Sequence, residues 1–121
     1  MTAAPRLSKR DETLVDLLIA AGMPRNLAKT IVVLWKREAT TSVDVEKATG
    51  LRQPEVSIAM QELRSRNWVE KSDLKKEGKG RPVHSYHLSV SFPAVVESLT
   101  QENRKRIEAM EENLRRLKAF V

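Results

Sequence analysis

Residues 41–67 have the sequence TSVDVEKATGLRQPEVSIAMQELRSRN, which predicts a short helix, a tight turn and a second helix. Thr41 followed by Asp44 fits a capping box at the start of the first helix, and Ser42 is a rival cap one residue later. Gly50 stands where a helix commonly ends in a left-handed residue. This order is typical of a helix–turn–helix motif, although an amphipathic hairpin in an ordinary helical core would show it as well.

The second helix of this motif has two different faces. Pro54 falls at its first position, where the N–H that proline lacks would have no intrahelical acceptor. Val56, Met60 and Leu63 recur at spacings of four and three residues, which predicts one buried face. The opposite face carries one apolar residue among hydrogen-bonding side chains of a length suited to the major groove of DNA: Gln53, Ser57, Ile58, Gln61 and Arg64.

Two more helices are predicted before the motif, after a flexible N-terminal tail over residues 1–10. Ser8 and Asp11 form a possible capping box for the first of these helices, and Gly22 ends it. Pro24 opens the second. The residues expected to be buried are Leu14, Leu17, Leu18 and Ala21 in the first helix and Leu27, Ile31, Leu34 and Trp35 in the second.

After the motif the apolar period changes from helical to alternating, which predicts a β-hairpin. Its strands are residues 68–74 and 83–90, and a basic loop with two glycines joins them at 75–82. Tyr86 and Leu88 fall on one face of the second strand. We expect these two side chains to pack on the helices.

Positive charge is concentrated around this loop. From Arg64 to Arg81 the chain has seven basic and three acidic residues, a local net charge of +4 within a total of +6. A charged hairpin tip is often merely solvated, but directly after a helix–turn–helix it is well placed to contact the phosphate backbone or the minor groove of DNA. The total charge favours a polyanionic partner, nucleic acid before a membrane surface.

Residues 92–121 predict one long helix with a heptad seam. The seam has one extra four-residue step at Asn103, a stutter that locally unwinds a supercoil. Because the far end of such a helix cannot fold back onto so small a domain, a second copy of the chain is the expected partner; the alternative is a helix packed on its own domain. The residues expected at the dimer interface are Val96, Leu99, Asn103, Ile107, Met110, Leu114 and Leu117.

Other classes of function find no support in the sequence. The 121 residues include no cysteine, which excludes disulfides, thiol nucleophiles and cysteine-based metal sensing. We find no signal peptide and no run long enough to span a bilayer, so we expect a cytoplasmic protein without membrane contact.

The Gly-Lys-Gly at residues 78–80 lacks the spacing of a phosphate-binding loop. His84 and His87 would point to opposite faces of a strand. We therefore expect no metal, no cofactor and no enzymatic activity.

The chain resembles the winged helix–turn–helix transcription regulators of the ArsR, MarR and TrmB-like groups. The resemblance is carried by Thr49-Gly-Leu-Arg-Gln-Pro-Glu-Val-Ser57, continued by Met60, Leu63 and Trp68-Val69, and by Gly80-Arg81 with Tyr86-His-Leu88 in the wing. In size and charge, small archaeal TrmB-like or MarR-like regulators are the most similar. One departure is that Asn67-Trp68 replaces the usual glycine before the first wing strand. The resemblance does not extend to the sugar-binding domain of larger TrmB proteins.

Pattern and resemblance together imply a mainly α fold with a small β-hairpin, comprising a winged helix–turn–helix domain over residues 11–90 and a dimerisation helix over 91–121. The resemblance implies a transcriptional regulator that binds double-stranded DNA sequence-specifically as a homodimer. Its recognition helix, about residues 53–65, would enter the major groove, and its wing, about 75–82, would reach the backbone or minor groove. The implied contacts are Arg52, Gln53, Ser57 and Gln61 to base edges, Thr41, Ser42 and Arg64 to phosphates, and Lys76, Lys79 and Arg81 from the wing.

Two other functions remain open at this point. A winged helix can serve as a protein-interaction module in a transcription-related complex, which an outward-facing Ile58 would favour. The basic wing alone could support non-specific packaging of DNA. Any effector would have to bind the dimer interface or the winged domain itself.

Overall fold

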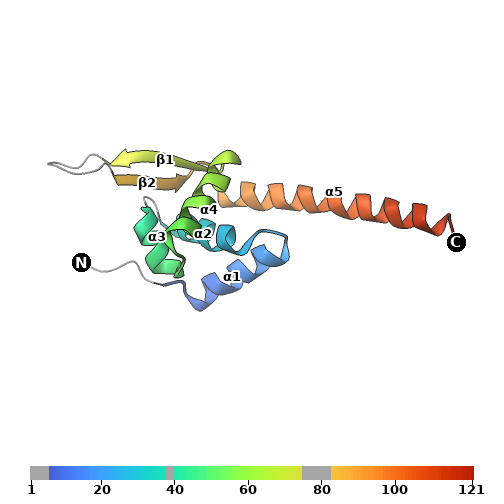
Figure 1. Ribbon diagram of the computed structural model, residues 1–121, viewed down its shortest axis with the longest axis horizontal. Coiled ribbons are helices and arrows are strands. Elements are labelled where there is room, and N and C mark those ends of the chain that lie inside the picture. The colour runs from blue at the N-terminus through green and yellow to red at the C-terminus, as the bar shows by residue number, and fades with distance from the viewer. Residues whose placement is uncertain (1–5, 38–39, 75–82) are drawn as a thin grey trace.

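The computed structural model describes residues 6–37, 40–74 and 83–121. The helices are α1 (Lys9–Ala20), α2 (Arg25–Lys36), α3 (Ser42–Thr49), α4 (Gln53–Ser65) and α5 (Phe92–Lys118), and the strands are β1 (Val69–Leu74) and β2 (Val83–Leu88) (Figure 1). Within these residues the predicted architecture is confirmed. It is mainly α, with one small β-hairpin and a long C-terminal helix.

Helix α2 is the centre of the core. It contacts α1, α3, α4 and β2, and it buries every residue from Leu27 to Leu34 except Lys29. The predicted burial of Leu27, Ile31 and Leu34 is confirmed. The full set of buried α2 residues is Leu27, Ala28, Thr30, Ile31, Val32, Val33 and Leu34.

Trp35, predicted to be buried in the same helix, is 42% exposed. Its ring stacks on that of Phe92 with a centroid separation of 4.1 Å and an interplanar angle of 12°, and Lys36 Nζ lies 4.7 Å from the Trp35 ring centroid. The last turn of α2 passes the edge of the core, where α5 begins. Trp35 therefore covers Phe92 instead of entering the core itself.

Helix α1 begins where the capping box predicts it to begin. Ser8 Oγ accepts the Asp11 N–H at 3.1 Å, and the Asp11 carboxylate accepts the Ser8 N–H at 3.2 Å, so the predicted capping box is confirmed. This cap places Lys9 and Arg10 in the first helical turn. The prediction of a flexible tail over residues 1–10 is therefore wrong for these two residues.

The buried face of α1 differs from the predicted one. Val15 and Leu18 are buried and Leu14 is half-buried. Leu17, predicted to be buried, is 63% exposed. The reason is that α1 packs on α2 along one side only, and Leu17 falls on the uncovered side.

The wing strands form an antiparallel pair. The register places Val69 opposite Leu88 and Lys71 opposite Tyr86. Thr40 adds a single bridge on the other side of Tyr86, with N–H to O distances of 3.1 and 2.8 Å. Tyr86 and Leu88 pack against the core, as predicted. The bridge thereby ties the hairpin to the segment that leads into α3.

Helix α5 packs on the domain over its first half only. Ser91 caps it through its Oγ, which accepts the Ala94 N–H at 3.2 Å, and Phe92, Val95 and Leu99 are buried against the core. From Arg104 onward every residue is exposed, and the helix extends away from the domain (Figure 1). No described helix has a stretch long and apolar enough to cross a membrane.

Candidate nucleic-acid interface

The helix–turn–helix is built by local interactions. Thr41 Oγ1 accepts the Asp44 N–H at 3.1 Å and the Asp44 carboxylate accepts the Thr41 N–H at 3.2 Å, so Thr41 is the cap of α3 and Ser42 is its first residue. Gly50 ends α3 with φ +79°, as predicted. Leu51 is half-buried in the turn and packs against the core.

Helix α4 covers the predicted range, residues 53–65. Arg52 precedes it, and the Glu55 carboxylate accepts the Arg52 N–H at 2.9 Å. Gln53 is therefore the first helical residue and Pro54 the second, not the first. Proline is tolerated at the second position for the same reason as at the first, because N–H groups of the opening turn have no intrahelical acceptor.

The two faces of α4 are as predicted. Val56, Met60 and Leu63 are buried, and so is Ala59. The predicted contact face is exposed along its whole length: Gln53, Ser57, Ile58, Gln61 and Arg64. Among the residues described, the four polar side chains of this face have no hydrogen-bond or ion-pair partner. Helix α4 therefore packs on the core through one face, and its opposite face presents hydrogen-bond donors and acceptors to solvent.

The predicted phosphate contacts lie at the two ends of the motif. Thr41 and Ser42 are half-buried at the start of α3, whereas Arg64 is exposed near the end of α4. Arg52, predicted to contact a base edge, is also exposed. Although Thr41 Oγ1 is used as an acceptor in the cap, its hydroxyl hydrogen remains available, since a hydroxyl both donates and accepts. Arg52 Nε lies 4.0 Å from Glu55. Lys76, Lys79 and Arg81, the predicted wing contacts, lie outside the described residues.

The base of the wing carries two histidine–carboxylate pairs. His84 Nδ1 lies 2.6 Å from Asp73, and His87 Nε2 lies 3.3 Å from Glu70. Each pair joins residues directly opposite in the hairpin. His84 is thus engaged within the wing. Within the described part of the chain, no group of three or more histidine, aspartate or glutamate side chains is arranged to hold a metal ion.

Arg66 connects α4 to α5, a link that was not predicted. Its guanidinium lies 3.1 Å from Glu62 and 3.4 Å from Glu102, and it covers the Trp68 ring at 5.0 Å. The spacing of Glu62 and Arg66 could have indicated their ion pair. The contact with Glu102 depends on how α4 and α5 meet and has no local signal.

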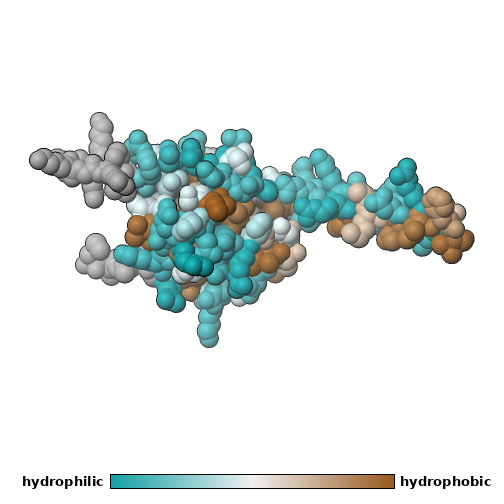
Figure 2. Space-filling model, viewed as in Figure 1, coloured by the Kyte–Doolittle hydropathy of each residue, from teal (hydrophilic) through white to brown (hydrophobic). Residues whose placement is uncertain are grey.

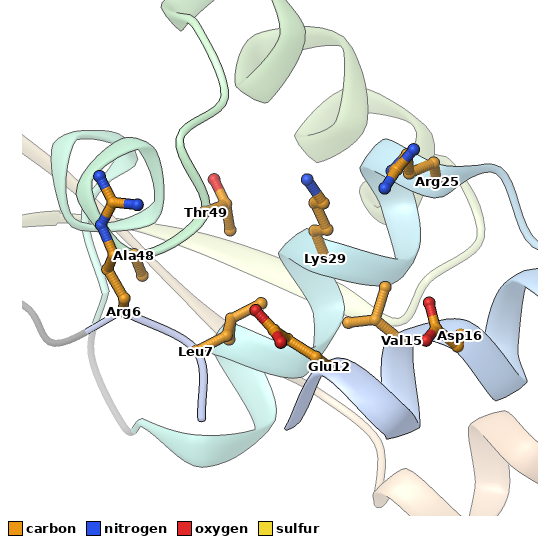
Figure 3. A pocket seen from close by; sticks show the side chains of 9 residues that line it. All are labelled: Arg6, Leu7, Glu12, Val15, Asp16, Arg25, Lys29, Ala48 and Thr49. Carbon is orange, nitrogen blue, oxygen red and sulfur yellow. The ribbon is translucent and has the colours of Figure 1, made fainter. Parts of the chain in front are cut away.

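A polar cavity lies beside the end of α3, the first helix of the motif (Figure 3). Its volume is about 380 Å³, and it is formed between the N-terminal segment, α1, α2 and the end of α3. Glu12 and Asp16 project from α1 and Lys29 from α2. The full lining is Arg6, Leu7, Glu12, Val15, Asp16, Arg25, Lys29, Ala48 and Thr49. The cavity offers both charges to a small polar molecule, and the sequence pattern did not indicate it.

Comparison with known proteins identifies the fold. No family model and no curated protein matches the sequence. Among solved structures, the archaeal chromatin protein TrmBL2 superposes with a TM-score of 0.63 at 17% identity, over 90% of this chain.

The fold is a winged helix.

This chain spans only 39% of the length of TrmBL2. Two other solved structures are less similar to this chain. A PadR family regulator from Clostridium difficile R20291 has 17% identity and a TM-score of 0.48, with coverage of 73% of this chain and 97% of that one. The adhesin competence repressor of Streptococcus pyogenes gives 17% identity, a TM-score of 0.47 and coverage of 90% and 82%.

Proposed function

We propose that this protein is a transcriptional regulator that binds double-stranded DNA sequence-specifically as a homodimer. The observation that carries the proposal is the outer face of α4. Gln53, Ser57 and Gln61 are exposed and have no partner among the described residues, and the buried face behind them fixes the helix that carries them. Glutamine side chains on such a helix can read base edges through paired hydrogen bonds, in particular those of adenine.

Charge supports DNA as the partner. The chain has a net charge of +6, and +4 of it falls between Arg64 and Arg81. Lysine and arginine side chains in the wing would neutralise phosphates and fix the position of the helix without reading sequence. The proposed activity is binding without catalysis, in the cytoplasm.

Helix α5 supports a dimer. Five of the predicted interface residues are exposed large apolar side chains: Val96, Ile107, Met110, Leu114 and Leu117. On the face seen in Figure 2, apolar residues gather at the far end of α5. Leu99 is 6% exposed and is largely used by its own domain. A two-fold dimer would present two recognition helices to half-sites about 34 Å apart, one helical turn of DNA.

Selection from random DNA duplexes at about physiological salt tests the proposal. We expect enrichment of an inverted repeat, which the Gln53→Ala/Gln61→Ala variant should fail to enrich. The variant Gln101→Ala, an exposed glutamine on α5, should enrich the same repeat as the natural protein. Recovery of no DNA would overturn the proposal and favour a protein-interaction module, for which the 66% exposed Ile58 would be the first contact to test.

Non-specific packaging of DNA is the second candidate. It is favoured by the similarity to TrmBL2, which is described as an archaeal chromatin protein with a novel mode of DNA binding. In the same selection, this function predicts that DNA is retained without enrichment of any sequence. The two outcomes separate the candidates because packaging depends on the backbone alone.

A further inference from the structure

An apolar groove runs between α1 and α5. Its volume is about 600 Å³, and its lining includes Leu14, Leu17, Val96 and Ile107. Leu17 is 63% and Val96 44% exposed, so the groove leaves large apolar side chains in water. At Asn103 and Ile107 it continues into a second hollow of about 310 Å³ along α5, which reaches Met110 and Leu114. We call the two together the α1–α5 groove.

We infer that each α1–α5 groove receives the C-terminal end of α5 from a second copy of the chain, so that the two α5 helices pair antiparallel. The inference rests on the proposed homodimer and specifies its arrangement. Each protomer has one bare helix end, with Leu114, Leu117 and Phe120 52%, 62% and 90% exposed, and one uncovered groove. Antiparallel pairing covers both grooves with both ends. Parallel pairing would pair the ends with each other and leave the grooves open.

The spacing of the seam fits this direction. In one antiparallel register Val96 lies opposite Leu117 of the partner subunit, Leu99 opposite Leu114 of the partner subunit, and Asn103 opposite Met110 of the partner subunit. The two-fold axis then passes between residues 106 and 107, so the interval from Asn103 to Met110 is centred on the axis and Ile107 lies next to it. Leu14 to Ala21 on α1 and Leu114 to Val121 on α5 each span about 10 Å at a helical rise of about 1.5 Å per residue, so the bare end is as long as the groove wall.

Asn103 argues against a parallel pair. In a parallel dimer it would face its own copy, and such a buried pair is satisfied when one amide donates to the other. Here Asn103 Nδ2 already donates to the carbonyls of Ala21 and Leu99, both at 2.8 Å. Both amide hydrogens are used inside the protomer. In the antiparallel register Asn103 lies opposite Met110 of the partner subunit, an apolar side chain that needs no hydrogen bond from the Asn103 amide.

Charges on the flank of the groove agree with the antiparallel register. Arg104 lines the groove, and Glu111 lines the hollow on α5. In the register given above, Arg104 lies about 3 Å along the axis from Glu111 of the partner subunit, taking about 1.5 Å per residue. The two-fold axis repeats this pair of opposite charges. In a parallel pair the same two residues would be about 10 Å apart along the axis.

Disulfide trapping tests the arrangement, because the natural chain has no cysteine. Two single variants are made at exposed positions, Val96→Cys and Leu117→Cys. We expect neither to form a disulfide-linked dimer alone and the two to form one when mixed and oxidised. The control mixture, Glu97→Cys with Lys118→Cys, uses exposed positions next to the seam and should remain uncrosslinked. Dimers from each single variant alone would overturn the inference in favour of parallel pairing.

A distance measurement covers the case in which the substitutions weaken the dimer. Nitroxide labels on Leu117→Cys should be about 30 Å apart, because the two label positions differ by 21 residues along the paired axes at about 1.5 Å each. A separation of about 10 Å, the spacing of neighbouring helix axes, would indicate parallel pairing and leave the homodimer standing. A monomeric mass for the natural protein would contradict both the homodimer and this arrangement. The DNA selection would still test DNA binding, because it does not depend on the mass measurement.

Discussion

Asn103 Nδ2 donates a hydrogen bond to the backbone carbonyl of Ala21 at 2.8 Å. This contact joins the middle of α5 to the residue that ends α1, 82 positions earlier in the chain. Gly22 follows with φ +100°. The absence of a side chain at Gly22 leaves room for Arg106, because a Cβ at Gly22 would lie 3.0 Å from Arg106 Nη1. The direction in which α5 leaves the domain is therefore set by polar contacts as well as by the buried Leu99.

The first prediction concerns this hydrogen bond. Asn103→Ala should lower the free energy of unfolding by about 1 kcal/mol relative to Asn113→Ala, the usual net value of one protein hydrogen bond. Asn113 is exposed on the same helix, so both variants gain the same helix propensity and their difference reports what the Asn103 side chain contributes through its hydrogen bonds to Ala21 and Leu99. Urea denaturation at one fixed protein concentration measures it, since the stability of a dimer depends on concentration. Equal midpoints for the two variants would show that the contact contributes nothing.

The second prediction separates base contacts from phosphate contacts. Gln61→Ala should reduce the preference at one base step by about 1–3 kcal/mol, because a bidentate contact to a base edge is lost. Arg64→Ala should weaken all duplexes about equally, because a phosphate contact reads no sequence. Titrations of the enriched site and its single-base variants measure both effects. If both changes lower affinity uniformly, the outer face of α4 is not the recognition face.

The third prediction concerns salt. If roughly six to ten phosphates are neutralised, the logarithm of the binding constant should fall against the logarithm of salt concentration with a slope of about −5 to −9. Fluorescence anisotropy between low and physiological salt gives the slope directly. An affinity that hardly changes with salt would contradict DNA binding through the wing.

The fourth prediction concerns the entry to the wing. Asn67 has φ +63°, the left-handed region that glycine adopts freely and asparagine tolerates. Asn67→Gly should leave the free energy of unfolding nearly unchanged, whereas Asn67→Ala should lower it by about 1–2 kcal/mol, because a Cβ without a local hydrogen bond is strained there. Thermal or urea unfolding of the two variants compares them. A larger loss for the glycine variant would mean that the Asn67 side chain, not its backbone, stabilises the turn.

Asn67 also shows how much of the fold the sequence could predict. The winged-helix pattern that the chain resembles has glycine at this point, and Asn67 adopts the left-handed conformation that glycine adopts freely and asparagine tolerates. The capping box of Thr41 and Asp44 and the left-handed Gly50 were predictable in the same way. Each depends on residues within a few positions, so local pattern was sufficient.

Contacts between distant segments were not predictable from pattern. The periodicity of α2 placed Trp35 in the core, but the start of α5 reaches its ring and Trp35 stacks on Phe92 instead. The whole apolar seam of α5 was predicted to contact a second copy of the chain. In the structure the first half of α5 also packs on its own domain, through Phe92, Val95 and Leu99. Arg66 bridges Glu62 and Glu102. Which of several possible partners a side chain meets depends on the packing of whole helices.

The single bridge between Thr40 and Tyr86 has a consequence for aggregation. A two-stranded sheet has two edges whose unpaired N–H and C=O groups can add further strands from other molecules. Thr40 occupies the edge of β2 at Tyr86, and in β1 the exposed Glu70, Lys71 and Asp73 place charges where another chain would have to pair. A concentrated solution of the protein is therefore protected against strand-by-strand growth at the described part of the hairpin, although the hairpin itself projects from the domain.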